Sequence, residues 1–348
     1  YNEAMSLTGN VILNAPSITT ASTIAAGSNN LTITTDALSL GSNITGTGAL
    51  VIQPKTNSTT VAIGSSATGT LALSDAALTY IKDAFSSITI GSATGTAAIG
   101  IDYAAASFTF SNPLVLRSNT GNIAAVDTLR TGSNALSLST TGTVNLAGVL
   151  SGALSVTGSA ITLNNDITTS GGQSYTGPVA LTANITLDST ASSSNGAVGF
   201  SSTVNSATST ARNLNVTAGS GNVTFTGAVG NTNALGAIAI DTTGTTTFSS
   251  TVNASSLTTN TGGTTSLGGN VTTSGALTLN DAVYLTNAVT LTAPTVNLNS
   301  ALTGNANSAL TINAINAMNL RANIRTVGNQ TYNSDVTVAG NISMTSTG

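Results

Sequence analysis

The chain has 348 residues, of which 40% are hydrophobic, 5% are charged and 3% are aromatic. Its net charge is -4 and it has only seven Lys and Arg residues, so no basic surface is available for a phosphate backbone and we expect no nucleic-acid partner. The absence of Cys and His removes disulfides, thiolate metal sites and the commonest general base.

The apolar content argues against disorder. Val, Ile, Leu and Thr recur along the whole chain, which favours a packed structure. No apolar run reaches the roughly 20 residues that a membrane-spanning helix needs, so we expect no transmembrane segment. The chain begins at Tyr1 without a signal segment and stops at Gly348 within a repeat. We therefore expect a mature or excised piece of a longer polypeptide.

Residues 1–70 alternate apolar and small polar residues in short segments, for example Leu31-Thr-Ile33-Thr. This period of two is typical of strands, and the Gly, Ser and Asn clusters between the segments are typical of sharp corners. A short echo, Ile63-Gly-Ser-Ser-Ala-Thr-Gly-Thr70, returns as Ile90-Gly-Ser-Ala-Thr-Gly-Thr96. We predict that residues 1–70 form N-terminal solenoid coils.

Residues 71–116 are less regular and contain the one helical candidate, near residues 75–85. Ser74 or Asp75 can cap its N-terminus, and apolar residues follow at roughly helical spacing as far as Phe85. We predict a helix of two to three turns at most, packed against one flank of the solenoid.

Residues 117–348 form a regular array. Phe200-Ser-Ser-Thr-Val204-Asn recurs unchanged from Phe248, and related segments begin at Phe225 and Leu267. Successive copies are roughly 19 to 25 residues apart, which fits one turn of a β-solenoid. We interpret each copy as one coil.

A longer repeat overlies these coils. The segment 167–187 returns at 324–344 with Gln-Ser/Thr-Tyr and Asn-Ile-Ser/Thr in register, at an offset of 157 residues. The segment 271–291 aligns with the same unit at an offset of 104 residues. The unit therefore recurs about every 52 residues.

These repeats predict an all-β parallel β-helix of about 15 to 17 coils, with residues 1–348 forming one continuous rod. Stacked coils place each inward residue against a near-copy of itself, so Val, Ile and Leu form internal ladders and Thr suits the outer faces. The terminal coils would have open sheet edges, which must be covered by more of the same chain or by another molecule.

The low-charge Thr/Asn/Gly composition, the unit Gln-x-Tyr-x3-Val-x-Leu/Val-x2-Asn-Ile-Thr/Ser-Leu/Met and coils such as Asn222-Val-Thr-Phe-Thr-Gly-Ala-Val-Gly230 resemble the filamentous-haemagglutinin-like group of large secreted bacterial β-solenoids. The resemblance covers nearly the whole chain, and the stretch from Leu71 to Leu114 is similar to a non-repeating insert that accompanies such arrays. It implies a secreted right-handed parallel β-helix that acts in adhesion, surface coats or filaments, without specifying a ligand.

Charged side chains offer few candidates for chemistry. Glycan-cleaving β-helices group Asp, Lys and Arg along one groove, whereas the carboxylates here are scattered and suit solvent-facing turns. They are Asp75, Asp83, Asp102, Asp127, Asp166, Asp188, Asp241, Asp281 and Asp335. Arg321 and Arg325 are four residues apart on an expected strand, hence on one face near Asp335, where they could bind an acidic sugar. The alternative is that both arginines are ordinary surface residues. The aligned earlier copy of the repeat has Asn164 and Thr168 at these positions, so the positions tolerate different side chains.

Aromatic side chains give a second candidate. Tyr175 and Tyr332 occupy equivalent places and could stack on a sugar ring, whereas Tyr284 lies in a different register. Aromatic residues that recur in step are more often corner or core packing. Calcium-repeat, phosphate-loop and nucleophile-elbow motifs are absent, so we predict no catalytic, cofactor or metal site.

The leading hypothesis is a structural, non-enzymatic protein of the bacterial cell surface or extracellular space. It would build a filament, sheath or adhesin by self-association through sheet edges and Thr/Asn-rich faces, helped by its low charge. The alternative is a carbohydrate- or receptor-binding passenger domain of an adhesin, with glycans or a neighbouring cell surface as partner. A polysaccharide-cleaving β-helix is the third alternative.

Overall fold

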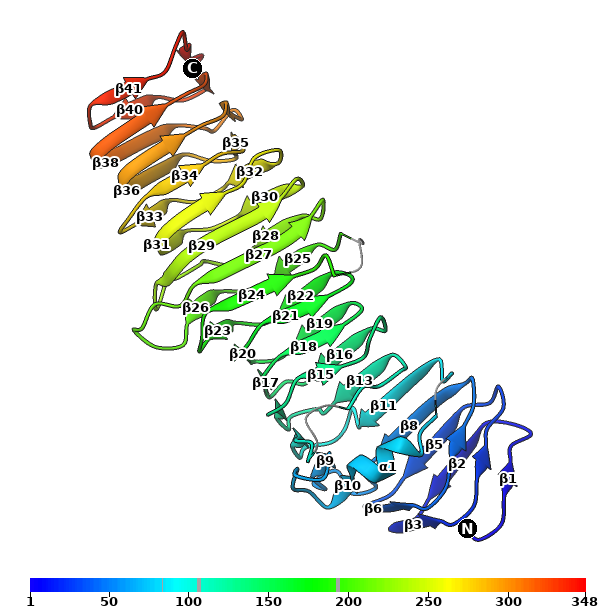
Figure 1. The fold of residues 1–348 in the computed structure, drawn as a ribbon. Coiled ribbons are helices and arrows are strands. Elements are labelled where there is room, and N and C mark those ends of the chain that lie inside the picture. Colours follow the sequence, from blue (N-terminus) through cyan, green and yellow to red (C-terminus); the bar gives the residue numbers. More distant parts are fainter. Residues whose placement is uncertain (83, 105–107, 192–194) are drawn as a thin grey trace. The chain divides into compact units, whose positions relative to one another are not determined.

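The fold is a parallel β-solenoid of about 17 turns with about 1% helix, as the sequence predicts. The computed structural model describes residues 1–82, 84–104, 108–191 and 195–348. The chain divides into two compact units, Tyr1–Thr162 and Leu163–Gly348, and in each of them successive coils stack as layers of short parallel strands (Figure 1).

Each regular coil has three sides, which we name face A, face B and face C in chain order. In the first unit, face A consists of β2 (Val11–Asn14), β5 (Leu31–Thr34), β8 (Ala49–Gln53), β11 (Ser87–Gly91), β13 (Leu114–Arg117), β16 (Leu136–Ser139) and β19 (Leu154–Thr157). Face B holds β3 (Ser17–Thr20), β6 (Ala37–Leu40), β10 (Leu71–Leu73), β9 (Val61–Ile63), β12 (Ile99–Ile101), β14 (Ile123–Ala125) and β17 (Thr143–Leu146). Face C holds β1 (Met5–Ser6), β4 (Ile24–Ala25), β7 (Ile44–Thr45), β15 (Leu129–Arg130) and β18 (Val149–Ser151), and β20 (Ala160–Leu163) lies at the boundary of the two units.

The second unit repeats this plan. Face A consists of β22 (Gln173–Thr176), β25 (Val198–Phe200), β28 (Val223–Phe225), β30 (Thr245–Phe248), β32 (Thr264–Leu267), β35 (Ala282–Leu285), β37 (Leu302–Gly304), β39 (Ile324–Thr326) and β42 (Met344–Ser346). Face B includes β23 (Val179–Leu181), β26 (Val204–Ser206), β33 (Val271–Thr273) and β40 (Gln330–Tyr332). Face C includes β21 (Ile167–Thr169), β24 (Ile185–Asp188), β27 (Leu214–Gly219), β34 (Leu277–Leu279) and β41 (Val336–Val338). The longer strands β29 (Leu235–Thr242), β31 (Val252–Thr259), β36 (Val289–Leu298) and β38 (Leu310–Leu320) continue from face B onto face C.

Inward ladders form the core of each unit. The strands alternate buried and more exposed residues because successive side chains of a strand point to opposite sides of the sheet. On face A of the first unit, one ladder runs through Leu13, Ile33, Ile52, Ile90, Leu116, Leu138 and Val156, all of them buried. Each of these side chains packs on a near-identical neighbour above and below, so the sequence repeat becomes a continuous apolar interior.

The irregular segment of the first unit contains the predicted helix, which is shorter than expected. Helix α1 (Asp75–Thr79) begins at Ser74, whose hydroxyl accepts a hydrogen bond of 3.2 Å from the N–H of Ala77, and it buries Leu78 against the solenoid flank (Figure 1). Asp83, expected within this helix, lies outside the described residues. After the helix the chain returns to the coil path, where Ile81 forms an isolated parallel bridge with Ile44.

Four aromatic rings form a stacked ladder on face A of the second unit. Tyr175, Phe200, Phe225 and Phe248 pair in register, with ring centroids 5.0, 4.9 and 4.9 Å apart and interplanar angles of 11°, 9° and 7°. All four rings are buried, and Leu267 takes the next place in the ladder. The three copies that begin with Phe, and the one that begins with Leu267, are therefore successive coils, which confirms the interpretation of this repeat.

Related corner sequences lie on different faces of the solenoid. The echo in the first unit places Gly64 after face B and Gly91 at the end of face A, with φ of 99° and 97°. A Cβ atom on Gly91 would lie 2.2 Å from the carbonyl oxygen of Arg117, so both the backbone angle and the close contact require glycine. The Ile-Gly-Ser sequence therefore forms a glycine corner in both copies, although one copy follows face B and the other follows face A.

We predict that Phe225→Ala destabilises the second unit by about 3 to 5 kcal/mol, because the central ring of the ladder loses contacts on both sides and leaves a cavity. Urea unfolding followed by circular dichroism measures this loss. The matched control is Tyr284→Ala on the outer side of β35, where 38% of the side chain is exposed and we expect a change within about 0.5 kcal/mol. Equal effects of the two substitutions would contradict a stabilising role for the ladder.

Candidate functional site

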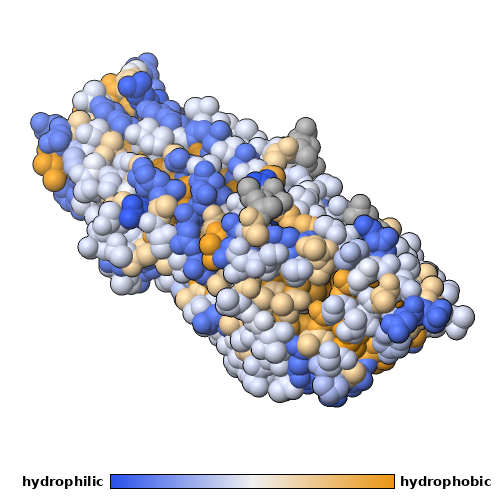
Figure 2. All heavy atoms as spheres, turned by 60° about the horizontal axis from the view of Figure 1, so that its bottom comes forward, coloured by the Kyte–Doolittle hydropathy of each residue, from blue (hydrophilic) through white to orange (hydrophobic). Residues whose placement is uncertain are grey.

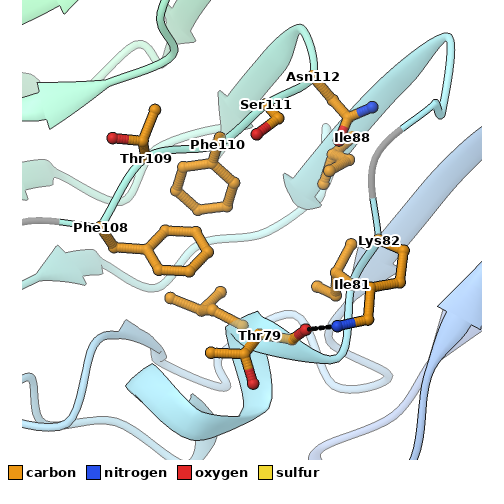
Figure 3. Close-up of a pocket in the computed structure, with 10 residues that line it drawn as sticks. Thr79, Ile81, Lys82, Ile88, Phe108, Thr109, Phe110, Ser111 and Asn112 are labelled. Carbon is orange, nitrogen blue, oxygen red and sulfur yellow. Dashed lines mark hydrogen bonds between the residues drawn. The ribbon is translucent and has the colours of Figure 1, made fainter.

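The irregular segment of the first unit encloses a cavity of about 300 Å³ beside α1. Its lining comes from the end of the helix, from β11 and from the loop that precedes β13: Leu78, Thr79, Ile81, Lys82, Ile88, Phe108, Thr109, Phe110, Ser111 and Asn112. Figure 3 shows the rings of Phe108 and Phe110 on one side of this space and Thr79, Ile81 and Lys82 on the other. The cavity thus combines aromatic surface with hydroxyl, amide and ammonium groups.

Hydrogen bonds hold several of the lining residues. The ammonium group of Lys82 donates to the carbonyl oxygen of Thr79 at 2.7 Å, which caps the end of α1. The buried amide of Asn112 donates to the carbonyl oxygen of Phe85 at 3.0 Å. Phe108 meets Phe110 edge to face at 4.9 Å, and Phe110 is buried whereas Phe108 is half-buried. Phe108 is therefore the ring that a bound molecule can reach.

Tyr103 lies next to this aromatic pair, with its ring 6.2 Å from that of Phe108. Its hydroxyl is buried and has no hydrogen-bond partner among the described residues. Burial, together with the nearby carboxylates of Asp127 and Asp75, raises the pKa of Tyr103 above its ordinary value. The hydroxyl therefore stays neutral beside the aromatic pair.

The two arginines that the sequence singled out do not form a site. Arg321 follows the end of β38 at a corner, whereas Arg325 lies in β39 on face A, so the expectation that both lie on one face of a single strand is wrong. The corner at residues 321–323 turns the chain between them. In the described part of the structure, no ion pair or hydrogen bond joins either guanidinium to Asp335. All three side chains are exposed.

The two equivalent tyrosines form the same hydrogen-bonded corner twice. The hydroxyl of Tyr175 donates to Gln173 Oε1 at 2.9 Å, and Gln173 Nε2 donates to Thr169 Oγ1 at 3.2 Å. In the second copy, the hydroxyl of Tyr332 donates to Gln330 Oε1 at 2.8 Å, and Gln330 Nε2 donates to Thr326 Oγ1 at 3.1 Å. In both copies the glutamine amide also donates to a carbonyl of the next coil, of Asp188 at 3.0 Å and of Thr345 at 2.7 Å.

Burial differs between these two corners. Tyr175 on face A is fully buried, whereas Tyr332 on face B is half-buried in the last coils of the second unit. Burial raises the pKa of both phenols above the ordinary value. Neither ring is placed to stack on a sugar, since each packs in an inward ladder. The repeated tyrosine is a structural element of the corner.

Most of the described aspartates hold backbone N–H groups at corners. Asp75 accepts from the N–H groups of Ser65 and Ala104 at 3.0 Å each, and Asp127 accepts from that of Tyr103 at 2.6 Å. Asp166 likewise accepts from the N–H of Thr186 at 2.7 Å in the next coil. Asp75 and Asp127 thus bind the N–H groups of two consecutive residues in the same loop, whereas Asp166 holds a separate corner in the second unit.

Asp281 contradicts the expectation of a solvent-facing turn residue, because its side chain is buried. It accepts hydrogen bonds from the N–H of Gly263 at 2.8 Å and from the hydroxyl of Thr265 at 3.2 Å. Burial raises the pKa of Asp281, while these two hydrogen bonds act in the opposite direction. Its sequence context, Leu-Asn-Asp-Ala after an alternating strand, resembles an ordinary corner and gives no sign of burial.

Asp36 is a corner carboxylate that sequence reasoning missed. It accepts four hydrogen bonds, from the N–H groups of Lys55 and Thr56 at 3.0 and 2.8 Å and from the hydroxyls of Thr56 and Thr59 at 2.7 and 2.8 Å. Partial burial acts to raise the pKa of Asp36, but these hydrogen bonds outweigh it and hold the pKa below its ordinary value. The donors are about one coil away in the sequence, which is why local patterns do not reveal them.

Comparisons with protein-family models, with curated proteins and with solved structures find no match to this chain. Within the described residues, the structure contains no helix with the length and apolar character to cross a membrane. The chain is a β-solenoid repeat protein by its own architecture.

We predict that Tyr175→Phe costs about 1 to 3 kcal/mol, because it leaves the buried Gln173 Oε1 without a donor. The equivalent Tyr332→Phe serves as a matched control and should cost less than about 1 kcal/mol, since water can hydrate the half-buried Gln330. Chemical denaturation of both variants measures the difference. If Tyr332→Phe costs as much as Tyr175→Phe, burial does not control the strength of this corner.

Proposed function

We propose that the protein is a structural building block of an extracellular bacterial filament, sheath or adhesin of the filamentous-haemagglutinin-like kind, and that it catalyses no reaction. The observation that carries this proposal is the regular stacking of near-identical coils, whose terminal strands have free edges. Among the described residues, β2 pairs only with β5, and β42 pairs only with β39. A free edge offers backbone N–H and C=O groups to a further coil, from the same polypeptide or from a neighbouring copy.

The outer faces support the same proposal. Polar side chains on them form ladders between coils: Asn319 Nδ2 donates to Asn297 Oδ1 at 2.7 Å, and Asn333 Nδ2 donates to Asn313 Oδ1 at 2.7 Å. The surface in Figure 2 is mostly pale, and an apolar area lies over coils of the first unit. With 5% charged residues, little electrostatic repulsion opposes contact between copies.

We predict that the purified protein assembles into filaments visible by electron microscopy, and that a Val338→Lys/Met344→Lys variant stays dispersed. Both residues lie in terminal strands in register with the buried Leu320 and Ile324, and they are 47% and 46% exposed. Lysines there place charge where a further coil would have to stack on the apolar interior, and circular dichroism checks that the variant is folded. The control Thr272→Lys/Thr303→Lys adds the same charge to outward positions within the stack and should still elongate. Dispersed wild-type protein at all concentrations, or filaments of the edge variant, would contradict assembly through edges.

A second candidate function is carbohydrate binding in the cavity beside α1. The half-buried ring of Phe108 faces a space of about 300 Å³ that is also lined by the polar residues Ser111 and Asn112, and this volume lies at the lower end of ligand pockets. An aromatic face with polar groups around it matches the apolar and polar sides of a sugar ring. This arrangement supports the role of an adhesin passenger domain.

We predict that Phe108→Ala abolishes binding of the purified protein to an array of neutral oligosaccharides. Tyr284→Ala, which removes an exposed ring from the second unit, should leave the binding unchanged. An array on which the wild-type protein binds nothing, or a Phe108→Ala variant that binds as the wild type does, would exclude this cavity as a sugar site.

A further inference from the structure

A second cavity of the first unit has a different chemistry. It has a volume of about 330 Å³ and lies over the ends of face A strands and the corners that follow them. Its lining residues are Ala93, Arg117, Ser118, Asn119, Ser139, Thr140, Thr141 and Thr157. Seven of them are neutral, none is acidic and none is aromatic, so the guanidinium of Arg117 alone sets the charge of the cavity.

Among the described residues, the guanidinium of Arg117 has no acceptor. None of its donors forms a hydrogen bond or ion pair with a described residue, and its Nε atom is buried without a partner. A guanidinium donates up to five hydrogen bonds, and a donor shielded from water without an acceptor costs free energy. The structure therefore holds a cation without a described protein acceptor beside an open cavity, where an incoming anion would accept hydrogen bonds from the accessible part of the guanidinium.

Three further polar side chains around the cavity are free to bind a ligand. Ser139 and Thr157 follow Arg117 in register on the next two strands of face A, and neither hydroxyl forms a hydrogen bond with a described residue. The side-chain amide of Asn119 is also without a described partner and is exposed. With strands about 4.8 Å apart, the guanidinium and the two hydroxyls extend over roughly 10 Å, about the length of a sugar unit with its substituents.

The wall behind these groups is firmly held. The buried hydroxyl of Ser118 bonds the carbonyl oxygens of Gly95 and Ala97 at 2.9 and 3.0 Å. One coil above, the hydroxyl of Thr140 donates to the carbonyl oxygen of Gly121 at 2.7 Å, and that of Thr141 donates to the carbonyl oxygen of Asn119 at 2.7 Å. Binding therefore requires little ordering of the backbone, which favours affinity.

We propose that this cavity binds the carboxylate of an acidic sugar, with Arg117 pairing to the carboxylate and Ser139, Thr157 and Asn119 bonding the sugar hydroxyls. The planar guanidinium fork matches two carboxylate oxygens. A single cation balances a single negative charge, whereas a phosphate monoester with about two charges would require more. Neutral hydrogen-bonding groups around one cation suit a polyhydroxylated monoanion. The proposal does not depend on the assembly role or on the cavity beside α1.

Fluorescence anisotropy with labelled trigalacturonate, at low and at physiological salt, tests the proposal on the complete chain. The wild-type protein should bind this probe more tightly than labelled neutral trigalactose, and added salt should weaken the binding. Arg117→Gln should reduce the affinity about tenfold or more, since it removes a charge-assisted hydrogen bond pair.

Arg130→Gln is the matched control. Arg130 also has a buried, unpartnered Nε, but it lies in β15 on face C and does not line this cavity, so its substitution should change the affinity less than twofold. Ser139→Tyr fills the cavity from an exposed position and should also abolish binding while Arg117 remains. Circular dichroism confirms that each variant is folded.

Three results would overturn the proposal. One is a wild-type protein that does not bind trigalacturonate at millimolar concentration. Another is an equal loss of affinity in the Arg117→Gln and Arg130→Gln variants, which would indicate non-specific attraction to positive charge. The third is tighter binding of a sulfated galactose trisaccharide than of trigalacturonate, which would refute the assignment of a carboxylate ligand.

Discussion

Parallel stacking in register is the constraint on which the rest of the structure depends. Strands about 4.8 Å apart place each residue over its counterpart in the coil below, so most inward side chains pack on side chains of similar size and polarity. The ring ladder from Tyr175 to Phe248 and the aliphatic ladder from Leu13 to Val156 both satisfy this condition. The same condition explains the scarcity of charge, because a repeated charged position would stack like charges at the strand spacing.

Polar groups obey the constraint through hydrogen bonds between coils. Asn297 bonds Asn319 on an outer face, and Thr140 reaches back to the carbonyl oxygen of Gly121 at a corner. Carboxylates also link neighbouring coils, because Asp166 and Asp36 accept hydrogen bonds from N–H groups one coil away. Arg117 is different, because its donors have no acceptor among the described residues and, unlike Arg130, it lines a cavity that a ligand can enter.

The sequence predicts the parts of the fold that follow from periodicity. The spacing from Phe200 to Phe225 and Phe248 corresponds to single coils, since residues that stack must recur once per turn. The sequence does not predict which face a segment occupies. The number of residues per coil varies, and the position of each corner decides on which face the next strand lies. For this reason the sequence predicts one strand for Arg321 and Arg325, although a corner separates them. The burial of Asp281 depends on Gly263 and Thr265 in the coil below, contacts that no local pattern records.

The corner built on Thr-x-Gly occurs on all three faces of the second unit. The hydroxyl of Thr169 donates to the carbonyl oxygen of Gly171 after face C, that of Thr273 to Gly275 after face B, and that of Thr326 to Gly328 after face A. A stretch of about 52 residues can thus be copied without being a whole number of turns. A duplicated segment that is not a whole number of coils is therefore still compatible with folding. Such a protein can be lengthened by segments of many sizes, and the duplicated residues can come to lie on any of the three faces.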